Sequence, residues 1–270
     1  MIFFTSCDTQ KKTASFNAVN SAGIINGTPV QANNELASSV VAIFRNLKIN
    51  DDSFWMHGCT GTILNSKQIL TAAHCVFSIA DNNLSINKED LLVSFSLNSL
   101  PFSKQVPKET RISLEQIEKK FVIRKILKIK AEPTWHSTTS DVAVITLSEP
   151  LPEKAKPLKI LSLEQIKQLP ISFPVTLLGY GVFSENPSIE SEILRETTVI
   201  ARLEDSLLIT DQTKGSGACL GDSGGPAFIQ IDKDYYQIGI VHGPRGENFV
   251  CNEEGEFLNP SFVQDYIKTP

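Results

Sequence analysis

The six residues Gly-Asp-Ser-Gly-Gly-Pro at 221–226 constrain the fold of this chain more than any other stretch. A single serine hydroxyl among glycines, whose bare backbone can approach a substrate carbonyl closely, is typical of a nucleophile site. A Gly-x-Ser-x-Gly turn also marks the α/β-hydrolases, but there the acid and the histidine follow the serine. In this chain His74 and Asp141 both precede Ser223. The order histidine, aspartate, serine therefore argues against the α/β-hydrolase fold.

Four blocks of sequence carry a resemblance to a known family. They are Ile24-Ile25-Asn26-Gly27, the segment from Cys59 to Cys75 that ends in Ala72-Ala73-His74-Cys75, the run Asp141-Val142-Ala143-Val144-Ile145-Thr146-Leu147, and the block from Cys219 to Pro226. With these blocks in this order, the chain resembles the chymotrypsin-like (trypsin-fold) serine proteases from about Ile24 to its C-terminus. The resemblance implies an all-β fold of two antiparallel Greek-key β-barrels with a short C-terminal helix.

The expected domains follow from this resemblance. We expect a leader or propeptide over residues 1–23 and a protease domain over 24–270, with the first barrel over about 24–135, the second over about 150–258 and the helix over about 260–268. Apolar and β-branched runs between turn residues predict the strands. These runs are 40–44, 62–64, 68–71, 91–97, 121–129 and 142–147 for the first barrel, and 173–178, 194–203, 207–210, 226–231 and 235–241 for the second. Ser-Leu-Glu-Gln-Ile occurs at 113–117 and 162–166, and each copy predicts a short capped helix.

The resemblance assigns the chemistry to three side chains. Ser223 would be the nucleophile, His74 the general base that takes its proton, and Asp141 the carboxylate that orients His74. The backbone amides of Gly221 and Ser223 would form the oxyanion hole. The chain is therefore expected to be a serine endopeptidase that works through an acyl-enzyme. Two other classes stay open: a catalytically silent homologue that acts as a binding or regulatory protein, and an esterase for small acyl esters.

The resemblance also implies activation by proteolysis. In the family, a cut before the block that begins at Ile24 releases an ammonium group, which pairs with the aspartate at the position of Asp222 and so sets the oxyanion amides. The full-length chain is thus expected to be a zymogen. Ala22 and Gly23 stand where many relatives have Arg or Lys, so the activating protease is expected to accept small residues.

Substrate preference is predicted from the positions that form the specificity pocket. Trypsin has an aspartate on the pocket floor, where this chain has Gly217, followed by Ala218. Cleavage after Arg or Lys is therefore disfavoured, and an apolar residue is expected on the acyl side. His242 and Gly243 are expected at the far wall, with His242 where a serine normally supports the catalytic aspartate. If the alignment slips by one residue, His242 faces the pocket instead, which would indicate a glutamate-specific protease.

Five cysteines indicate an oxidising compartment. By resemblance, Cys59 pairs with Cys75 beside the histidine and Cys219 pairs with Cys251 beside the pocket. Two disulfides are few for this family, which places the chain closer to its bacterial members. Cys7 is left over and ends a start that resembles the end of a bacterial lipoprotein signal, while the alternative is a free thiol in a tail. We expect a secreted or cell-envelope protein, lipid-anchored if Cys7 is acylated.

Composition argues against several kinds of partner. The formal net charge is −5, from 25 basic and 30 acidic residues that are interspersed, which argues against a nucleic-acid surface. No apolar run reaches the roughly 18 residues of a membrane helix, so contact with a membrane is expected only through a lipid on Cys7. The predicted partners are a protein or peptide substrate and an activating protease. No metal or other cofactor is expected.

Overall fold

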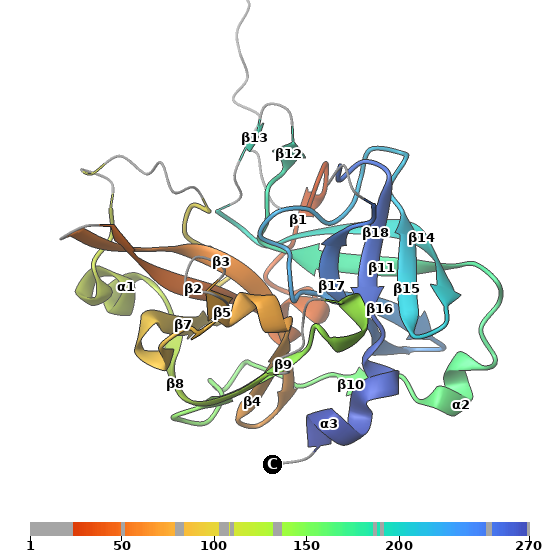
Figure 1. Ribbon diagram of the computed structural model, residues 1–270, viewed down its shortest axis with the longest axis horizontal. Coiled ribbons are helices and arrows are strands. Elements are labelled where there is room, and N and C mark those ends of the chain that lie inside the picture. Colours follow the sequence, from red (N-terminus) through yellow and green to blue (C-terminus); the bar gives the residue numbers. More distant parts are fainter. Residues whose placement is uncertain are drawn as a thin grey trace, which may run out of the picture.

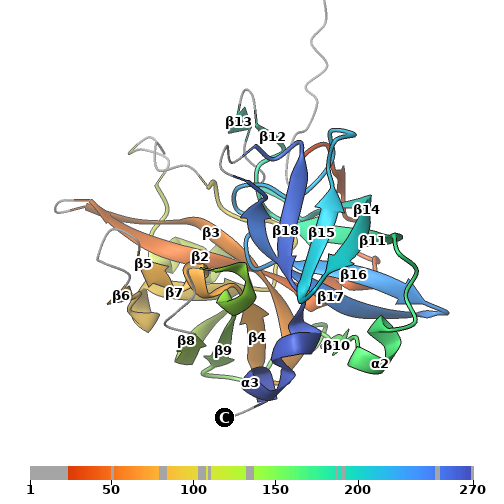
Figure 2. The ribbon, with the colours of Figure 1, turned by 45° about the vertical axis from the view of Figure 1, so that its right-hand side comes forward.

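The computed structural model of the chain describes residues 24–49, 52–78, 84–102, 108, 111–131, 137–185, 188–189, 192–246 and 250–268. Its strands form two β-barrels that lie side by side, one from the orange to green part of the chain and one from the green-cyan to blue part (Figure 1). The same two bodies remain distinct when the molecule is turned (Figure 2). The all-β, two-barrel fold that the motifs predicted is confirmed.

The first barrel is a closed ring of six strands in the order β2, β3, β4, β9, β8 and β7, and every neighbouring pair is antiparallel. The strands are β2 (Val40–Ile49), β3 (Asp52–Asn65), β4 (Gln68–Thr71), β7 (Leu91–Ser94), β8 (Ile123–Ala131) and β9 (Ala143–Leu147), with β5 (Phe77–Ser78) and β6 (Leu84–Ser85) as a separate small pair. Thr71 of β4 pairs with Ala143 of β9. The chain leaving β4 therefore lies beside the chain that enters β9.

The second barrel follows the order β14, β11, β16, β17, β18 and β15, and it closes because β15 also pairs with β14. Two short strands, β1 and β10, join its edges. The strands are β1 (Thr28–Pro29), β10 (Lys159–Ile160), β11 (Phe173–Gly179), β14 (Arg195–Glu204), β15 (Leu207–Asp211), β16 (Pro226–Ile231), β17 (Asp234–Pro244) and β18 (Glu254–Leu258), and β12 (Ser184–Glu185) pairs with β13 (Ser188–Ile189) outside the barrel.

Branched aliphatic side chains fill the two barrels. Strand side chains alternate between two faces, and the inward set packs into the interior of a small barrel. Ile43, Ile63 and Ile69 are fully buried in the first barrel, and Leu177 and Ile238 in the second. Burial of each such side chain contributes roughly 1.5–3 kcal/mol, so these interiors hold the strand registers on which the site depends.

A third apolar cluster joins the barrels at their seam. Phe44 of β2 is buried in the same cluster as Tyr180 and Phe228, which belong to the second half of the chain. The Tyr180 hydroxyl donates to the carbonyl oxygen of Ser96 in the first half, at 2.9 Å. The two barrels therefore pack as one body, and residues from both can meet at the seam.

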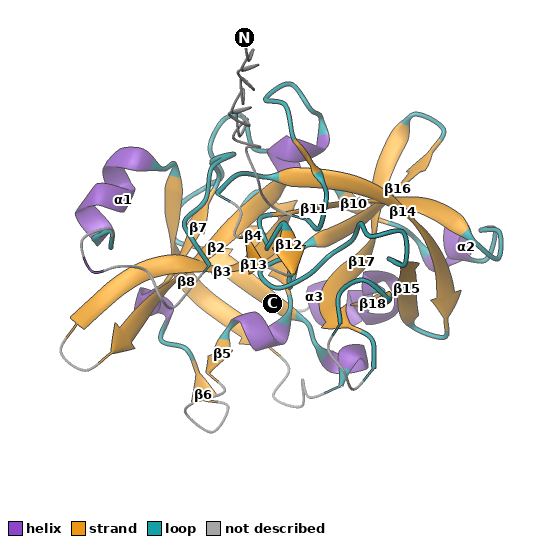
Figure 3. Cartoon of the chain, turned by 90° about the horizontal axis from the view of Figure 1, so that it is seen from above, coloured by secondary structure: helices purple, strands orange, loops and turns teal. Residues whose placement is uncertain are grey.

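Few helices are present, and they lie outside the barrels (Figure 3). α1 (Leu114–Lys120) and α2 (Leu163–Ile166) each begin with a complete capping box, as the two Ser-Leu-Glu-Gln-Ile copies predicted. Short 3-10 turns are η1 (Leu36–Ser39), η2 (Ala73–Cys75), η4 (Lys88–Asp90), η6 (Thr138–Ser140) and η7 (Pro260–Val263). The predicted C-terminal helix is confirmed as η7 followed by α3 (Gln264–Lys268). Among the described residues, no helix has both the length and the apolar character to cross a membrane.

Three expectations about organisation need correction or fall outside the structure. The first barrel ends with β9 at Leu147, which agrees with the strand expected at 142–147 and lies beyond the domain boundary expected near residue 135. The sequence patterns also missed β18, because Glu-Gly-Glu at its start lacks the apolar alternation of a strand. This segment is a strand because it pairs with β15 and β17 in the second barrel. The expected leader at 1–23, with Cys7, lies outside the described residues.

Candidate active site

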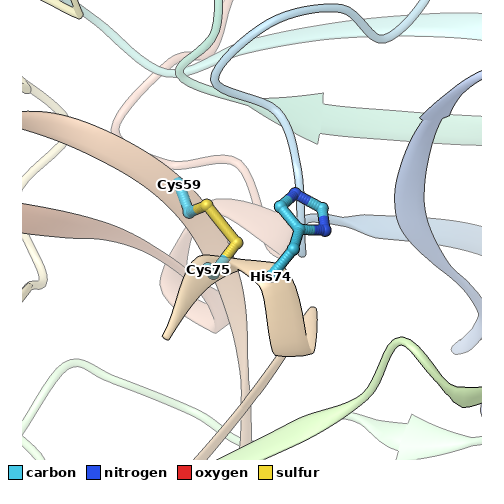
Figure 4. Close-up of side chains that lie close together, drawn as sticks. All are labelled: Cys59, His74 and Cys75. Atoms are coloured by element: carbon cyan, nitrogen blue, oxygen red, sulfur yellow. A yellow bond between two sulfur atoms is a disulfide. The ribbon is translucent and has the colours of Figure 1, made fainter. Parts of the chain in front are cut away.

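His74 lies in η2, directly after β4 and beside a disulfide. Ala72 and Ala73 before it are fully buried, so the turn packs against the first barrel where larger side chains would not fit. Cys75 after it is bonded to Cys59 of β3, and Figure 4 shows the disulfide and His74 side by side on this turn. The imidazole itself is 21% exposed. A braced backbone thus presents a ring that substrate can reach.

Asp141 meets His74 because the ends of β4 and β9 lie side by side. Oδ1 of Asp141 accepts from the backbone N–H of His74 at 2.9 Å, and Oδ2 lies 2.7 Å from Nδ1 of its ring. The aspartate side chain is fully buried. Burial opposes its charge, but hydrogen bonds from His242 and His74 hold the pKa of Asp141 well below its usual value. The carboxylate is therefore ionised and fixes both the position and the tautomer of His74.

His242 is the second imidazole on the same carboxylate. Its Nδ1 lies 2.5 Å from Oδ2 of Asp141, and its ring stands nearly perpendicular to that of His74, with centroids 5.8 Å apart. This contact corresponds to the first of the two alignments considered above, in which His242 supports the aspartate. The side chain is 28% exposed, so it also reaches the surface of the site.

Ser223 lies in a tight turn at the seam between the barrels. Its carbonyl oxygen accepts from the backbone N–H of Thr60 in the first barrel at 2.9 Å, and the N–H of Gly224 donates to Val241 in the second at 2.8 Å. Gly224 has a φ of +78°, and a Cβ there would lie 2.0 Å from Oγ1 of Thr71. Only glycine lets this turn approach β4, and the Cys75 sulfur is 3.5 Å from the Ser223 carbonyl oxygen. The serine turn therefore packs directly against the histidine turn.

Two backbone amides of the serine turn are unpaired within the described part of the chain. Among the described residues, the N–H groups of Gly221 and Ser223 have no hydrogen-bond acceptor. Gly221 adopts a φ of +90°, which requires glycine. Buried backbone donors nearly always find a partner in folded proteins. Two backbone N–H groups without acceptors, both in a serine turn, are the kind of donors that an oxyanion hole requires.

Sequence reasoning did not single out His57. This ring is fully buried, and its Nε2 lies 2.9 Å from the carbonyl oxygen of Gly221, to which it must donate because a carbonyl only accepts. Thr60 Oγ1 donates to the same oxygen at 3.0 Å. His57 thus holds the Gly221–Asp222 peptide group, which lies between the two unpaired amides. No local pattern reveals this role, since the two residues are 164 positions apart.

We expect the buried state of His57 to appear as a pH dependence of stability. Burial lowers its pKa to about 4 from 6.5, although the bond to Gly221 opposes this shift. The unfolded chain therefore binds a proton near pH 6.5 that the folded protein rejects, and stability is lost as the pH falls from 6.5 toward 4. Between pH 7.5 and pH 4.5 the free energy of unfolding should therefore fall by about 3 kcal/mol more in this protein than in His57→Gln, whose amide does not titrate.

The measurement is urea unfolding of both proteins between pH 4.5 and 7.5, in a Ser223→Ala background that prevents self-digestion. The difference between the two proteins isolates this group from the other titrating residues. Parallel pH curves for the two proteins would contradict a buried, neutral His57.

Asp222 is a buried carboxylate without a basic side chain among the described residues. Its oxygens accept from the N–H of Gly181 at 2.8 Å and of Cys219 at 2.9 Å. Burial raises its pKa to about 7, although these two bonds oppose the shift. Such a group gains strongly from a cation brought beside it.

The first residues of the described chain dock near the segments that hold Asp222. Ile24 is fully buried in the second barrel, and Ile25 exchanges backbone hydrogen bonds with Gly217 at 2.8 and 3.3 Å. Asn26 donates to the carbonyl of Phe183 at 3.1 Å. Ile24 has a φ of +52°, which is strained for a β-branched residue.

The predicted pocket floor is occupied by a side chain that the sequence did not point to. Gln212 is fully buried, and its amide donates to the carbonyls of Ala218 at 3.1 Å and Cys251 at 2.5 Å while accepting from the Ala218 N–H at 2.8 Å. A Cβ placed on Gly217 would lie 2.1 Å from Cδ of Gln212. The amide therefore takes the place of a side chain at 217. Around Gly243, at the expected wall, a Cβ would meet open space.

Both disulfides implied by the resemblance are present. Cys59 is bonded to Cys75 and Cys219 to Cys251, with Cα atoms 6.0 and 5.4 Å apart. Disulfides persist in oxidising compartments, which indicates an extracytoplasmic protein.

Metal-ligand side chains come together only where other bonds already use them, within the part of the chain that the structure describes. Cys59, Cys75 and His74 form one group, but its two sulfurs are joined as a disulfide. His74, Asp141 and His242 form the other, and hydrogen bonds already join its atoms. We assign no metal to either group.

Comparison with known proteins covers the whole of this site. The family model described as Trypsin matches residues 24–263. Similar proteins include chymotrypsin-C of Mus musculus, 26% identical over 238 residues (80% of this chain and 79% of the mouse protein), and chymotrypsin-C of Bos taurus, 25% identical over 218 residues (74% and 72%). Trypsin eta of Drosophila melanogaster is 24% identical over 235 residues (80% and 77%).

Proposed function

The chain belongs to the trypsin family of serine proteases, and from that premise we propose that it is an endopeptidase that hydrolyses peptide bonds through an acyl-enzyme on Ser223. The observation that carries the proposal is the His74–Asp141 pair packed against a serine turn whose two amides lack acceptors among the described residues. Each part of acyl-transfer chemistry then has a residue to perform it.

The proposed reaction uses these parts in turn. Ser223 Oγ attacks the scissile carbonyl carbon while Nε2 of His74 takes the hydroxyl proton. Asp141, held ionised, stabilises the imidazolium that forms, and the amides of Gly221 and Ser223 stabilise the oxyanion. His74 then gives the proton to the leaving amine. Water, activated by the same ring, hydrolyses the ester of Ser223 and restores the enzyme.

We also propose that the full-length chain is a zymogen activated by cleavage before Ile24. The new ammonium group would pair with Asp222, whose buried carboxylate lacks a basic partner among the described residues. The strained φ of Ile24 supports the same idea, because φ is defined by the preceding carbonyl carbon and ceases to exist when that bond is cut. Cleavage would thus remove strain and supply a cation in one step.

One experiment tests the activity and the processing together. Replacing Gly23 with Arg creates a junction that immobilised trypsin can cut, and intact mass shows which form reacts with a fluorophosphonate probe. We expect the probe to label Ser223 in the form that begins at Ile24 and to label the uncut chain at least about 100-fold more slowly. The variant Gly23→Arg with Ser223→Ala is the matched control and should not react.

The outcomes separate the candidate functions. No labelling of the processed form would favour the catalytically silent, regulatory homologue. Equal labelling of both forms would keep the protease and reject the zymogen. Turnover of short acyl esters without peptide cleavage would favour the esterase.

The proposed specificity is an apolar residue on the acyl side of the cleaved bond. Gln212 gives the floor at Gly217 a neutral amide whose polar atoms are already paired. A buried Arg or Lys side chain would find no charge there, and an unpaired buried cation is costly. The contact between His242 and Asp141 weighs against the glutamate-specific alternative, which needs that ring in the pocket.

Location and partners complete the proposal. The expected partners are a protein or peptide substrate and an activating protease that accepts Gly23 before the cut. Lipid anchoring through Cys7 and membership of the bacterial branch stay predictions from the sequence.

A further inference from the structure

The unusual feature of this site is that one buried carboxylate oxygen accepts from two imidazoles. Oδ2 of Asp141 lies 2.7 Å from Nδ1 of His74 and 2.5 Å from Nδ1 of His242. A hydroxyl bonded to this carboxylate would not change charge near neutral pH. Histidine does change charge there.

The geometry fixes the tautomers of both rings. An ionised carboxylate only accepts hydrogen bonds, so each Nδ1 must carry a proton. In each neutral ring Nε2 then carries no proton, and both rings are partly exposed to solvent. Asp141 therefore supports two bases with a single negative charge. A proton gained by either ring creates a cation, and that cation opposes a proton on the other ring 5.8 Å away.

Most of the other charged side chains near His242 form salt bridges with one another. His242 lies on β17 at an irregularity of its pairing with β18, between Val241 and Gly243. From η6 no titratable side chain besides Asp141 approaches it, since that turn is Thr-Thr-Ser. β18, which pairs with β17, carries Glu254 and Glu256, and Arg245 follows β17. Arg202 and Glu204 of β14 reach Glu254 and Arg245 through salt bridges. β16, which also pairs with β17, carries no charged side chain.

Four of these groups form a closed network. Arg245 bonds Glu204 at 2.7 Å and Glu254 at 3.3 Å, and Arg202 bonds the same two carboxylates at 2.7 and 2.8 Å. Hydrogen bonds from Arg245 and Arg202 lower the pKa of Glu204 to about 2, so its charge is constant near neutral pH. Within the described residues, Asp141 is the one carboxylate bonded to His242. The charge of His242 is thus linked chiefly to the catalytic pair.

The geometry points to His242 as a positioning residue of a His–Asp–His unit. Its protonation is linked to that of His74 through the carboxylate of Asp141, which both rings share. Neutral His242 holds Asp141 toward His74. Protonated His242 forms an ion pair with Asp141 and offsets its negative charge. The imidazolium of His74 then lacks the anion that would stabilise it. Both rings are therefore neutral in the fully active state. As the pH falls, activity is lost in two coupled protonation steps, one on each ring. This role rests on the proposed peptidase function.

The first test is an NMR titration of the histidine rings, which needs no catalysis. Full-length protein with Ser223→Ala, labelled with nitrogen-15 at histidine, is compared with the same protein carrying His242→Asn, whose amide can donate to Asp141 but cannot titrate. We expect two strongly downfield Nδ1 protons in the first protein and one in the second. The His74 signals should titrate in two steps with His242 present and in one step without it.

The second test is the pH profile of the processed enzyme. We expect log kcat/KM to fall below neutrality with a slope that approaches 2 in the wild type and stays at 1 in His242→Asn and in His242→Ser. At pH 8 both variants should lower kcat by less than about 10-fold with little change in KM, because Asp141 keeps a neutral donor.

The results distinguish the two proposals. A single-step His74 titration that is identical in wild type and variant would overturn the coupling, whatever the activity. Coupled titration in a processed protein that cleaves no peptide would instead reject the peptidase function and leave the His–Asp–His unit standing. If His242→Asn does not fold, His242→Ser decides the same question.

Discussion

Replacing Ser223 with alanine is expected to lower kcat for peptide hydrolysis by about a million-fold. The hydroxyl is the atom that forms the acyl bond, and no neighbouring group replaces it, so only the oxyanion amides and substrate binding would continue to assist attack by water. A residual rate roughly a thousand-fold above the uncatalysed reaction is expected from them. The fold should be kept, because Ser223 contacts Thr60 through its backbone carbonyl oxygen, which the substitution leaves in place.

The measurement is turnover of processed wild type and Ser223→Ala on peptides with Leu or Phe at the acyl side of the cleaved bond. Peptides with Arg there serve as the specificity control and should react at least about 100-fold more slowly in the wild type, because an unpaired buried cation costs several kcal/mol. Ser148→Ala changes an exposed serine outside the site and is the matched variant. Undiminished turnover by Ser223→Ala would reject the proposed nucleophile.

Replacing Asp141 with asparagine is expected to lower kcat by about 10⁴-fold with little change in KM. An amide nitrogen in place of Oδ2 would face the Nδ1 atoms of both imidazoles, which must then accept instead of donate. Nε2 of His74 would carry the proton and could not act as a base, and the wrong tautomer costs this much in triads of this geometry. Near-normal protein stability should accompany the loss, because the shape of the side chain is kept.

Asp90→Asn is the matched control, since Asp90 is a carboxylate bonded to Lys48 and Asn46 away from the site. Single-turnover acylation by a chromogenic ester measures the step directly. The assignment of Asp141 would be wrong if Asp141→Asn kept more than a tenth of the wild-type rate while folded.

The fold and the candidate triad could be predicted from the sequence because the family resemblance that implies them is carried by short local blocks. The glycines around Ser223, the small residues before His74 and the apolar run after Asp141 each predict a backbone setting within a few positions. The capping boxes that start α1 and α2 are equally local, and both were predicted correctly. By contrast, β18 carries a Glu-Gly-Glu start and becomes a strand only through its pairing with β15 and β17.

The sequence by itself determined which side chains are candidates for the chemistry, because order and residue type select the nucleophile, base and acid without coordinates. Only the tertiary structure decided what surrounds them. His57 reaches the Gly221 carbonyl across 164 positions, and His242 reaches Asp141 across 101. Gln212 fills the space beside Gly217 because the chain between them turns back on itself. The two histidine contacts depend on how two closed barrels pack against each other, and no pattern within either segment records that packing.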